Sequence, residues 1–314
     1  MTRIVRFADS TGTVRTGVAD EEGGIRGFDG APRIADLLRL PAPELRSLTE
    51  NLATVRPGID ERDVLLLPPL DGLMELWAAG VTYERSREGR VAESSERSIY
   101  QRVYDAERPE LFFKSQPWRV VTDGEPIAIR DDSQLNVPEP ELGLALNSCG
   151  ETVGYLIIND VSSRSIEGEN PLYLPQAKIY AGSSAVSAGI VPAWLVGDPD
   201  TLKISVIVRR NGEVAYQAST STAALHRTPQ GLVDHLWRSQ PFPDGAVLST
   251  GTGIVPELDF TLRGGDVVEI SIDGVGVLRN PVLGSQADLG WLVEAIDHPL
   301  VRRAHRADGG NENS

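Results

Sequence analysis

The chain has 314 residues, of which 40% are hydrophobic and 24% charged, a composition typical of a globular protein large enough to bury a core and shape a cleft. Its 45 acidic residues outnumber 30 Lys and Arg and give a formal charge of −15. This balance argues against nucleic acid and anionic membranes as partners, because both require clustered positive charge. The single cysteine excludes an intrachain disulfide.

Residues 1–67 predict a small N-terminal domain. The opening MTRIVRFADSTG alternates like a strand and lacks the apolar core of a signal peptide. Further short strands with Gly-containing turns follow, then a helix around RIADLLRL, and the paired prolines of LLLPPLDG predict a connector. No stretch of the sequence approaches the ~20 apolar residues of a membrane span, so we expect a cytoplasmic protein.

Residues 68–314 predict a larger domain that is rich in strands. LWAAGVTY has a strand pattern, and the polar, Arg- and Glu-rich segment 84–107 predicts an exposed helix or lid. Downstream, β-branched runs and hairpins with Asn-Gly or Asp-Gly turns predict further strands. RTPQGLVDHLWRS predicts a helix, because Thr228 can cap it and Pro229 suits its first turn. The fold class expected is mostly β, of the α+β type.

Two glutamates stand at alternate positions in the segment NVPEPELGLAL. Because residues two apart in a strand share a face, Glu139 and Glu141 project side by side, while Pro140 faces away and restricts pairing to an edge or a strand start. Two adjacent carboxylates ionise together only if a proton or a cation lies between them. A solvated strand face is the alternative interpretation of this pair.

Asp160 ends the apolar strand GYLIIND. If its strand neighbours that of Glu139 and Glu141, the three carboxylates form a site made of oxygen alone. Such a site favours a hard cation, Mg²⁺ first, with Mn²⁺ and Ca²⁺ as alternatives. A turn-forming aspartate is the other interpretation of Asp160.

Lys178 interrupts the nearly uncharged segment YLPQAKIYAGSSAVSAGIVP. A lysine in such surroundings is either a snorkelling surface residue or a partly desolvated amine. Desolvation lowers the pKa of an amine and suits it to act as a base. Both interpretations are open at this point.

Several of these motifs together resemble the fumarylacetoacetate hydrolase superfamily. PEPELGLAL, GYLIINDVSSRS, Lys178, TGTGIVP and GDVVEISIDGVGVLRNPV occur in that family's order and span roughly residues 70–285. The resemblance implies a mixed β-sandwich roll preceded by a smaller N-terminal domain, assembled as a homodimer or homotetramer. It also implies a divalent metal on Glu139, Glu141 and Asp160, with Lys178 reaching into the active site.

The segment GVTYERSREGR departs from part of that family. Its hydrolases and oxaloacetate decarboxylases resemble one another in a Gly-x-Asn-Tyr-x-x-His motif, whose His joins a Glu to activate water. Here Tyr83 is kept, Thr82 replaces the Asn and Ser86 stands in place of the His. None of the four histidines lies near this segment in the sequence, which argues against hydrolysis.

With RPELFFK and TGTGIVP, the same segment is similar to the 2-keto-3-deoxy sugar acid dehydratases of the superfamily, including the arabinonate and xylonate enzymes of pentose degradation. The resemblance implies conversion of a 2-keto-3-deoxypentonate to 2,5-dioxopentanoate (α-ketoglutarate semialdehyde) and water. Lys178 would remove a C3 proton or stabilise the enolate, and Glu110 would protonate the departing C4 hydroxyl.

Four residues are predicted to bind the substrate. Arg85, Ser86 and Arg87 lie in the predicted lid, where the arginines would hold the hydroxyls or the carboxylate unless they are solvated helix charges. Thr252 lies in the glycine-rich STGTG turn, whose backbone N–H groups suit an anion.

Two other functions remain open from the sequence. One is a C–C bond hydrolase or decarboxylase of another 2-oxo acid, of the fumarylpyruvate, acylpyruvate or oxaloacetate type, with the metal site intact but a different base. The other is a non-catalytic protein that binds a sugar acid or has a structural role. Lys178 argues against it, because a binder needs no buried amine beside a metal.

Overall fold

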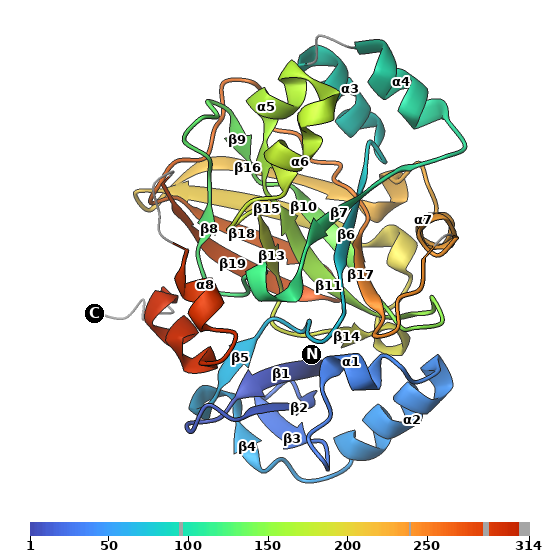
Figure 1. The fold of residues 1–314 in the computed structure, drawn as a ribbon, viewed down its shortest axis with the longest axis vertical. Coiled ribbons are helices and arrows are strands. Elements are labelled where there is room, and N and C mark those ends of the chain that lie inside the picture. The colour runs from blue at the N-terminus through green and yellow to red at the C-terminus, as the bar shows by residue number, and fades with distance from the viewer. Residues whose placement is uncertain (94–96, 239, 285–288, 308–314) are drawn as a thin grey trace.

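The computed structural model describes residues 1–93, 97–238, 240–284 and 289–307. A small N-terminal sheet lies at one end of the molecule, a larger β body occupies the middle, and a group of helices gathers at the other end (Figure 1). The expectation of a mostly β, α+β fold is confirmed. Within the described ranges, no helix has both the length and the apolar character needed to cross a membrane.

The N-terminal part contains a five-stranded sheet of order β4-β3-β2-β1-β5. Its strands are β1 Arg3–Ala8, β2 Val14–Ala19, β3 Gly24–Gly27, β4 Ile59–Asp60 and β5 Leu65–Leu67. The first three leucines of LLLPPLDG were expected in a connector, but they form β5, which pairs antiparallel with β1. Helices α1 Ile34–Leu37 and α2 Ala42–Ala53 cover this sheet.

The N-terminal part shares its core with the rest of the chain. The backbones of Ile4 and Ile190 exchange two hydrogen bonds, of 2.8 and 2.9 Å. Ile4 and Val18 belong to the same apolar cluster as Leu156 and Val247 of the β body. The division into domains 1–67 and 68–314 therefore stays a prediction.

The larger sheet of the β body has the order β13-β11-β10-β17-β6-β7, and β14 also pairs with β11. All pairs are antiparallel except β6 with β17. Its strands are β6 Leu76–Gly80, β7 Glu110–Ser115, β10 Pro140–Leu146, β11 Thr152–Asp160, β13 Ser184–Val186, β14 Val191–Pro192 and β17 Ala246–Ser249.

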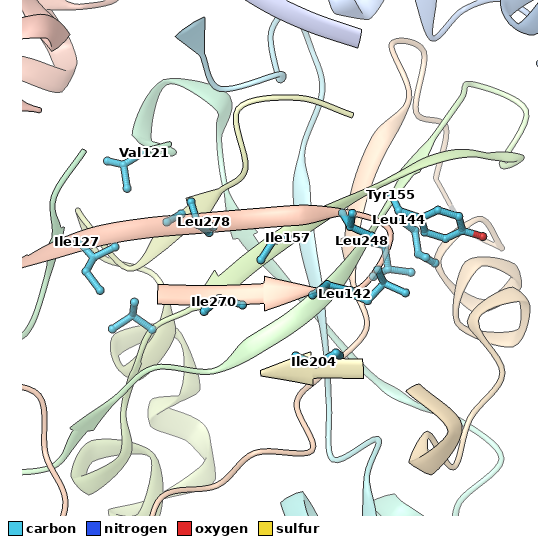
Figure 2. Packing of buried hydrophobic residues seen from close by; sticks show 14 of the residues in the cluster. Val121, Ile127, Leu142, Leu144, Tyr155, Ile157, Ile204, Leu248, Ile270 and Leu278 are labelled. Carbon is cyan, nitrogen blue, oxygen red and sulfur yellow. The ribbon is translucent and has the colours of Figure 1, made fainter. Parts of the chain in front are cut away.

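A second sheet packs on the first with the order β16-β15-β18-β19-β8. Figure 2 shows Leu142 and Leu144 of β10 and Ile157 of β11 packing with Ile204 and Ile270 of this second sheet. The strands of this second sheet are β8 Ile127–Ala128, β15 Lys203–Arg210, β16 Glu213–Ser221, β18 Val267–Ile272 and β19 Gly276–Leu283. A separate two-stranded sheet consists of β9 Asn136–Val137 and β12 Ser162–Ser163.

Helices α3, α4, α5 and α6 lie at the end of the β body away from the N-terminal sheet (Figure 1). Helix α7 begins as predicted, because Thr228 Oγ1 accepts from the Gly231 N–H at 3.1 Å and Pro229 occupies the first turn. The bounds are α3 Glu84–Glu93, α4 Arg97–Asp105, α5 Arg164–Glu169, α6 Leu174–Lys178, α7 Pro229–Leu236 and α8 Trp291–Glu294.

Short 3₁₀ helices fill several of the connections. They are Glu61–Asp63, Pro117–Arg119, Pro171–Tyr173, Ala193–Leu195, Pro199–Thr201, Thr222–Ala224 and Pro299–His305. The segment Pro171–Tyr173 leads directly into α6, whose last residue is Lys178. Helix α6 lies at the end of the β body where α3 and α5 also lie (Figure 1).

Candidate active site

The pairing of β10 with β11 brings three carboxylates together. Pro140 faces Asn159 in the register, and the Asp160 N–H donates to the Glu139 carbonyl at 3.0 Å. Asp160 therefore lies across from Glu139, and Glu141 lies two residues further along the same face. One oxygen of each carboxylate lies within 4.8 Å of those of the other two, and all three residues are buried. β10 starts at Pro140, where the missing N–H costs no ladder hydrogen bond.

Glu141 is held by the neighbouring strand and the glycine-rich turn. Its Oε2 accepts from the Ser249 hydroxyl and, at 2.9 Å, from the Gly251 N–H. Gly251 has a φ of +91°, and a Cβ there would overlap Thr82, so the turn requires glycine. Burial, and then the charges of Asp160 and Glu139, raise the pKa of Glu141 well above its ordinary value. The carboxylate cluster therefore needs a proton or a cation.

Lys178, at the end of α6, supplies a positive charge to this cluster. Its Nζ donates to Glu139 Oε2 at 2.6 Å and to Asp160 Oδ2 at 3.0 Å. Only 2% of the residue is exposed, so it is a desolvated amine and not a snorkelling surface lysine. The ammonium thus partly compensates the negative charge of the three carboxylates. Their buried oxygens are also suitable ligands for a hard divalent ion.

A second buried lysine, Lys114 of β7, was not assigned a role from the sequence. Its Nζ lies 2.6 Å from Asp160 Oδ1 and also donates to the carbonyls of Val161, at 3.4 Å, and Lys178. Burial lowers the pKa of Lys114, while the charge of Asp160 acts in the opposite direction. Its sequence signal, one lysine in the apolar segment LFFKSQPWRVV, is the same as that of Lys178.

These groups surround a cavity of about 10 Å³, roughly the space that one water molecule needs. A five-carbon acid enters it only if surrounding side chains move. The residues that line it are Ala79, Gly80, Val81, Ser86, Glu110, Phe112, Glu139, Glu141, Asp160, Glu167, Lys178 and Thr252.

Glu110 reaches the cavity from the start of β7. It faces Gly80 in the β6–β7 register, and a Cβ on Gly80 would overlap the Glu110 carboxylate. The glycine therefore leaves the space in which that carboxylate lies. Glu110 and Lys178 line the same cavity from β7 and α6.

Ser86 and Thr252 also line the cavity, and both are nearly inaccessible to solvent. Thr252 Oγ1 donates to the Pro140 carbonyl at 3.0 Å and accepts from the Ile254 N–H at 3.1 Å. This hydroxyl thus ties the glycine-rich turn to the start of β10. Ser86 comes from α3, so the predicted lid helix forms one wall of the cavity.

Arg85 and Arg87 are not among the described residues that line the cavity. Arg85 is half-exposed and pairs with Glu257, and Arg87 pairs with Glu84 at 3.0 Å. The Arg87 guanidinium also lies over the Tyr104 ring, 5.0 Å from its centroid. Their role in substrate binding stays a prediction.

Two further cavity residues carry little sequence signal. Glu167 of α5 is buried, although RSIEGE reads as an ordinary polar turn of helix. Val81 follows β6 with a φ of +52°, a region that β-branched residues rarely occupy. Backbone strain of this kind concentrates at functional sites.

Comparison with known proteins places the chain in a family. Residues 77–283 match the family model described as fumarylacetoacetate (FAA) hydrolase, C-terminal. The chain belongs to the fumarylacetoacetate hydrolase family. The match covers most of the range, 70–285, over which the sequence resembles this family, and the expected family fold is confirmed by solved structures.

Two curated relatives are dehydratases of deoxy sugar acids. A probable 2-keto-3-deoxyxylonate dehydratase of Haloferax volcanii is 44% identical over 281 residues, which are 89% of this chain and 95% of the relative. A 2-dehydro-3-deoxy-D-arabinonate dehydratase of Saccharolobus solfataricus is 44% identical over 224 residues, 70% of this chain and 75% of that protein.

A solved structure of a dehydratase is also similar to this chain. It is 2-keto-3-deoxy-D-arabinonate dehydratase complexed with magnesium and 2,5-dioxopentanoate. The match has a TM-score of 0.77 and 36% identity, and it covers 90% of this chain and 99% of that one. The similarity to this branch of the family therefore extends over both the N-terminal part and the β body.

Proposed function

We propose that this chain is a Mg²⁺-dependent dehydratase that converts a 2-keto-3-deoxypentonate, of the arabinonate or xylonate type, to 2,5-dioxopentanoate and water. The observation that carries the proposal is one cavity lined by three clustered carboxylates, Lys178 and Glu110. The chain also shares 44% identity with the probable 2-keto-3-deoxyxylonate dehydratase of Haloferax volcanii.

Glu139, Glu141 and Asp160 would hold the Mg²⁺. They offer only carboxylate oxygens, which suit this ion better than a softer metal that prefers nitrogen or sulfur. When bound, Mg²⁺ polarises the keto group of a 2-oxo acid and so acidifies the hydrogens on C3.

The chain's own residues would move the protons. Lys178 accepts a proton from C3 or, as a cation, stabilises the enolate. Glu110 donates a proton to the C4 hydroxyl, which leaves as water while a C3–C4 double bond forms. Proton transfers from C5 to C3 and from the resulting enol hydroxyl to C4 then give the aldehyde, with no further change in composition.

Ser86 supports dehydration over hydrolysis. It lines the cavity from α3, where the hydrolase motif would carry its histidine. A serine hydroxyl does not accept a proton from water near neutral pH, whereas dehydration needs no activated water. Ser86 and Thr252 remain candidates for substrate hydrogen bonds, and Arg85 and Arg87 for contacts that form after side chains rearrange.

The proposal extends to the setting of the enzyme. A 2-keto-3-deoxypentonate is a product of pentose oxidation, so we assign the chain to pentose degradation. We also propose a cytoplasmic location and a homodimer or homotetramer, as the family resemblance implies. Size-exclusion chromatography with light scattering tests the assembly.

The activity is tested with a panel of substrates. Purified protein with Mg²⁺ is given racemic 2-keto-3-deoxypentonate, oxaloacetate or an acylpyruvate in parallel, and the products are identified by mass spectrometry. We expect 2,5-dioxopentanoate from the first substrate alone. Cleavage of the acylpyruvate or decarboxylation of oxaloacetate, with no semialdehyde, would replace this proposal by the hydrolase or decarboxylase alternative.

A further inference from the structure

We propose that Lys114 keeps Asp160 a one-oxygen metal ligand and thereby sets the preference of the carboxylate cluster for Mg²⁺ over Ca²⁺. The inference rests on the proposed function, in that it takes the three carboxylates as the metal site. It concerns a positioning residue that acts through Asp160.

Lys114 makes two hydrogen bonds to backbone carbonyls and an ion pair with Asp160. A lysine ammonium has three N–H groups, and this one contacts Asp160 Oδ1 at 2.6 Å, the Val161 carbonyl and the Lys178 carbonyl. The side chain has no exposed surface. The position of Lys114 is therefore fixed by the two segments that carry Asp160 and Lys178.

The two oxygens of Asp160 have different surroundings. Oδ2 contacts the Lys178 ammonium, which also binds Glu139 and lines the cavity, so this oxygen faces the carboxylate cluster and Lys178 would give way to a bound metal ion. Oδ1 contacts the Lys114 ammonium, which is not among the described residues that line the cavity and is held by two backbone carbonyls. A divalent ion that bound Oδ1 as well as Oδ2 would lie close to the Lys114 ammonium, because both would contact the same oxygen. Two cations that are so close repel strongly in a buried site. Lys114 thus favours Oδ2 as the single ligand oxygen.

The number of oxygens per carboxylate distinguishes the two metals. Mg²⁺ demands a near-ideal octahedron, whereas Ca²⁺ takes six to eight oxygens and often binds a carboxylate through both. Glu141 is restricted similarly, because Ser249 and Gly251 hold its Oε2. If each of the three carboxylates supplied one oxygen, an octahedral ion would keep room for oxygen ligands from a 2-oxo acid. Lys114 imposes the corresponding restriction on Asp160, by leaving only Oδ2 for the metal.

Metal competition without substrate tests the inference. Mn²⁺ is bound to the protein, and its displacement by Mg²⁺ or Ca²⁺ is followed by electron paramagnetic resonance. The wild type should bind Mg²⁺ more tightly than Ca²⁺, and Lys114→Met should lower this affinity ratio about tenfold, because Ca²⁺ gains a second oxygen of Asp160. Arg302→Met is the matched control. Arg302 is a buried cation 2.6 Å from Glu125 and is not among the described residues that line the acidic cavity. The ratio of Mg²⁺ to Ca²⁺ affinity in Arg302→Met should therefore stay at the wild-type value.

A folded Lys114→Met variant with the wild-type ratio would overturn the inference, as would an equal change in Arg302→Met. A general loss of packing weakens both metals together and leaves their ratio unchanged. If Lys114→Met does not fold, a wild-type crystal structure with Mg²⁺ decides instead. Ligation through Oδ2 alone supports the inference, and ligation through Oδ1 contradicts it. A wild type that shows the predicted ratio but no turnover would refute the proposed function alone.

Discussion

Asp160, the last residue of β11, lies opposite Glu139, the residue just before β10, and the Asp160 N–H donates to the Glu139 carbonyl at 3.0 Å. Both residues are buried, and the two strands that they flank or end lie inside the larger sheet. The spacing of their carboxylates is therefore set by the sheet register, and a register shift of one residue would separate them. A catalytic metal benefits from such a rigid frame.

Glu139→Gln should weaken Mg²⁺ binding. The substitution keeps the size of the side chain but removes the charge that a hard cation requires. Loss of an outer-shell partner already costs about 10–100-fold in metal affinity, so loss of a direct ligand should cost at least that much. Isothermal titration calorimetry measures the effect, with Glu257→Gln, an exposed carboxylate outside the cavity, as control. Equal affinity in both variants would remove Glu139 from the metal site.

Lys178→Met should change turnover and metal affinity in opposite directions. Loss of a positioned base should lower kcat by about 10²–10⁴-fold. Mg²⁺ should bind more tightly, because the ammonium that contacts Glu139 and Asp160 is gone. Steady-state kinetics and calorimetry measure the two effects, and Lys203→Met, an exposed lysine on β15, is the control. Unchanged kcat would exclude Lys178 from the chemistry.

Glu141→Gln should change how stability depends on pH in the metal-free protein. Burial and the neighbouring carboxylates raise the pKa of Glu141 in the folded state above its ordinary 4.5. Between the unfolded and folded pKa values the folded state binds more protons, so wild-type stability falls as pH rises through this window, by up to about 1.4 kcal/mol per pH unit.

Glutamine removes this penalty. In chelator, Glu141→Gln should be increasingly more stable than the wild type as pH rises above 4.5, and saturating Mg²⁺ should reverse the order, because only the wild type has the full ligand set. Urea unfolding at several pH values measures the difference. Parallel pH curves for the two metal-free proteins would show that folding does not raise the pKa of Glu141.

Gly80→Ala should impair catalysis without removing the metal. The new methyl group would overlap the Glu110 carboxylate and displace it from the cavity. We expect kcat to fall by about tenfold or more, because a misplaced proton donor loses most of its effect, while Mg²⁺ affinity stays near the wild-type value. Gly197→Ala is the control, since nothing lies within 4 Å of a Cβ there. Wild-type kcat in Gly80→Ala would argue against Glu110 as the acid.

Local patterns predicted part of the site. The alternation of Glu139 and Glu141 and the position of Asp160 at a strand end are visible within short segments, and so is a lysine in an apolar stretch. Lys114 has the same signal as Lys178, but its meaning depends on Asp160, a partner brought close only by the fold. The orientation of Arg85 likewise depends on Glu257, which lies on a distant loop.

Some elements of the fold were predicted correctly and others were missed, depending on whether neighbouring residues in the sequence determine them. Helix α7 follows local capping rules and begins where expected. Helix α2 was not predicted, because prolines stand at its N-cap and in its first turn, where they are in fact tolerated. β5 was taken for a connector because its strand character comes from pairing with β1, an interaction between distant segments.

The most direct test of the account is the initial rate of 2,5-dioxopentanoate formation from 2-keto-3-deoxypentonate, measured against Mg²⁺ concentration after chelator treatment. We predict no product without metal, a saturable rise with Mg²⁺ in the wild type, and a shift of the Glu139→Gln curve to much higher Mg²⁺. Equal rates in excess chelator and in saturating Mg²⁺ would contradict the account.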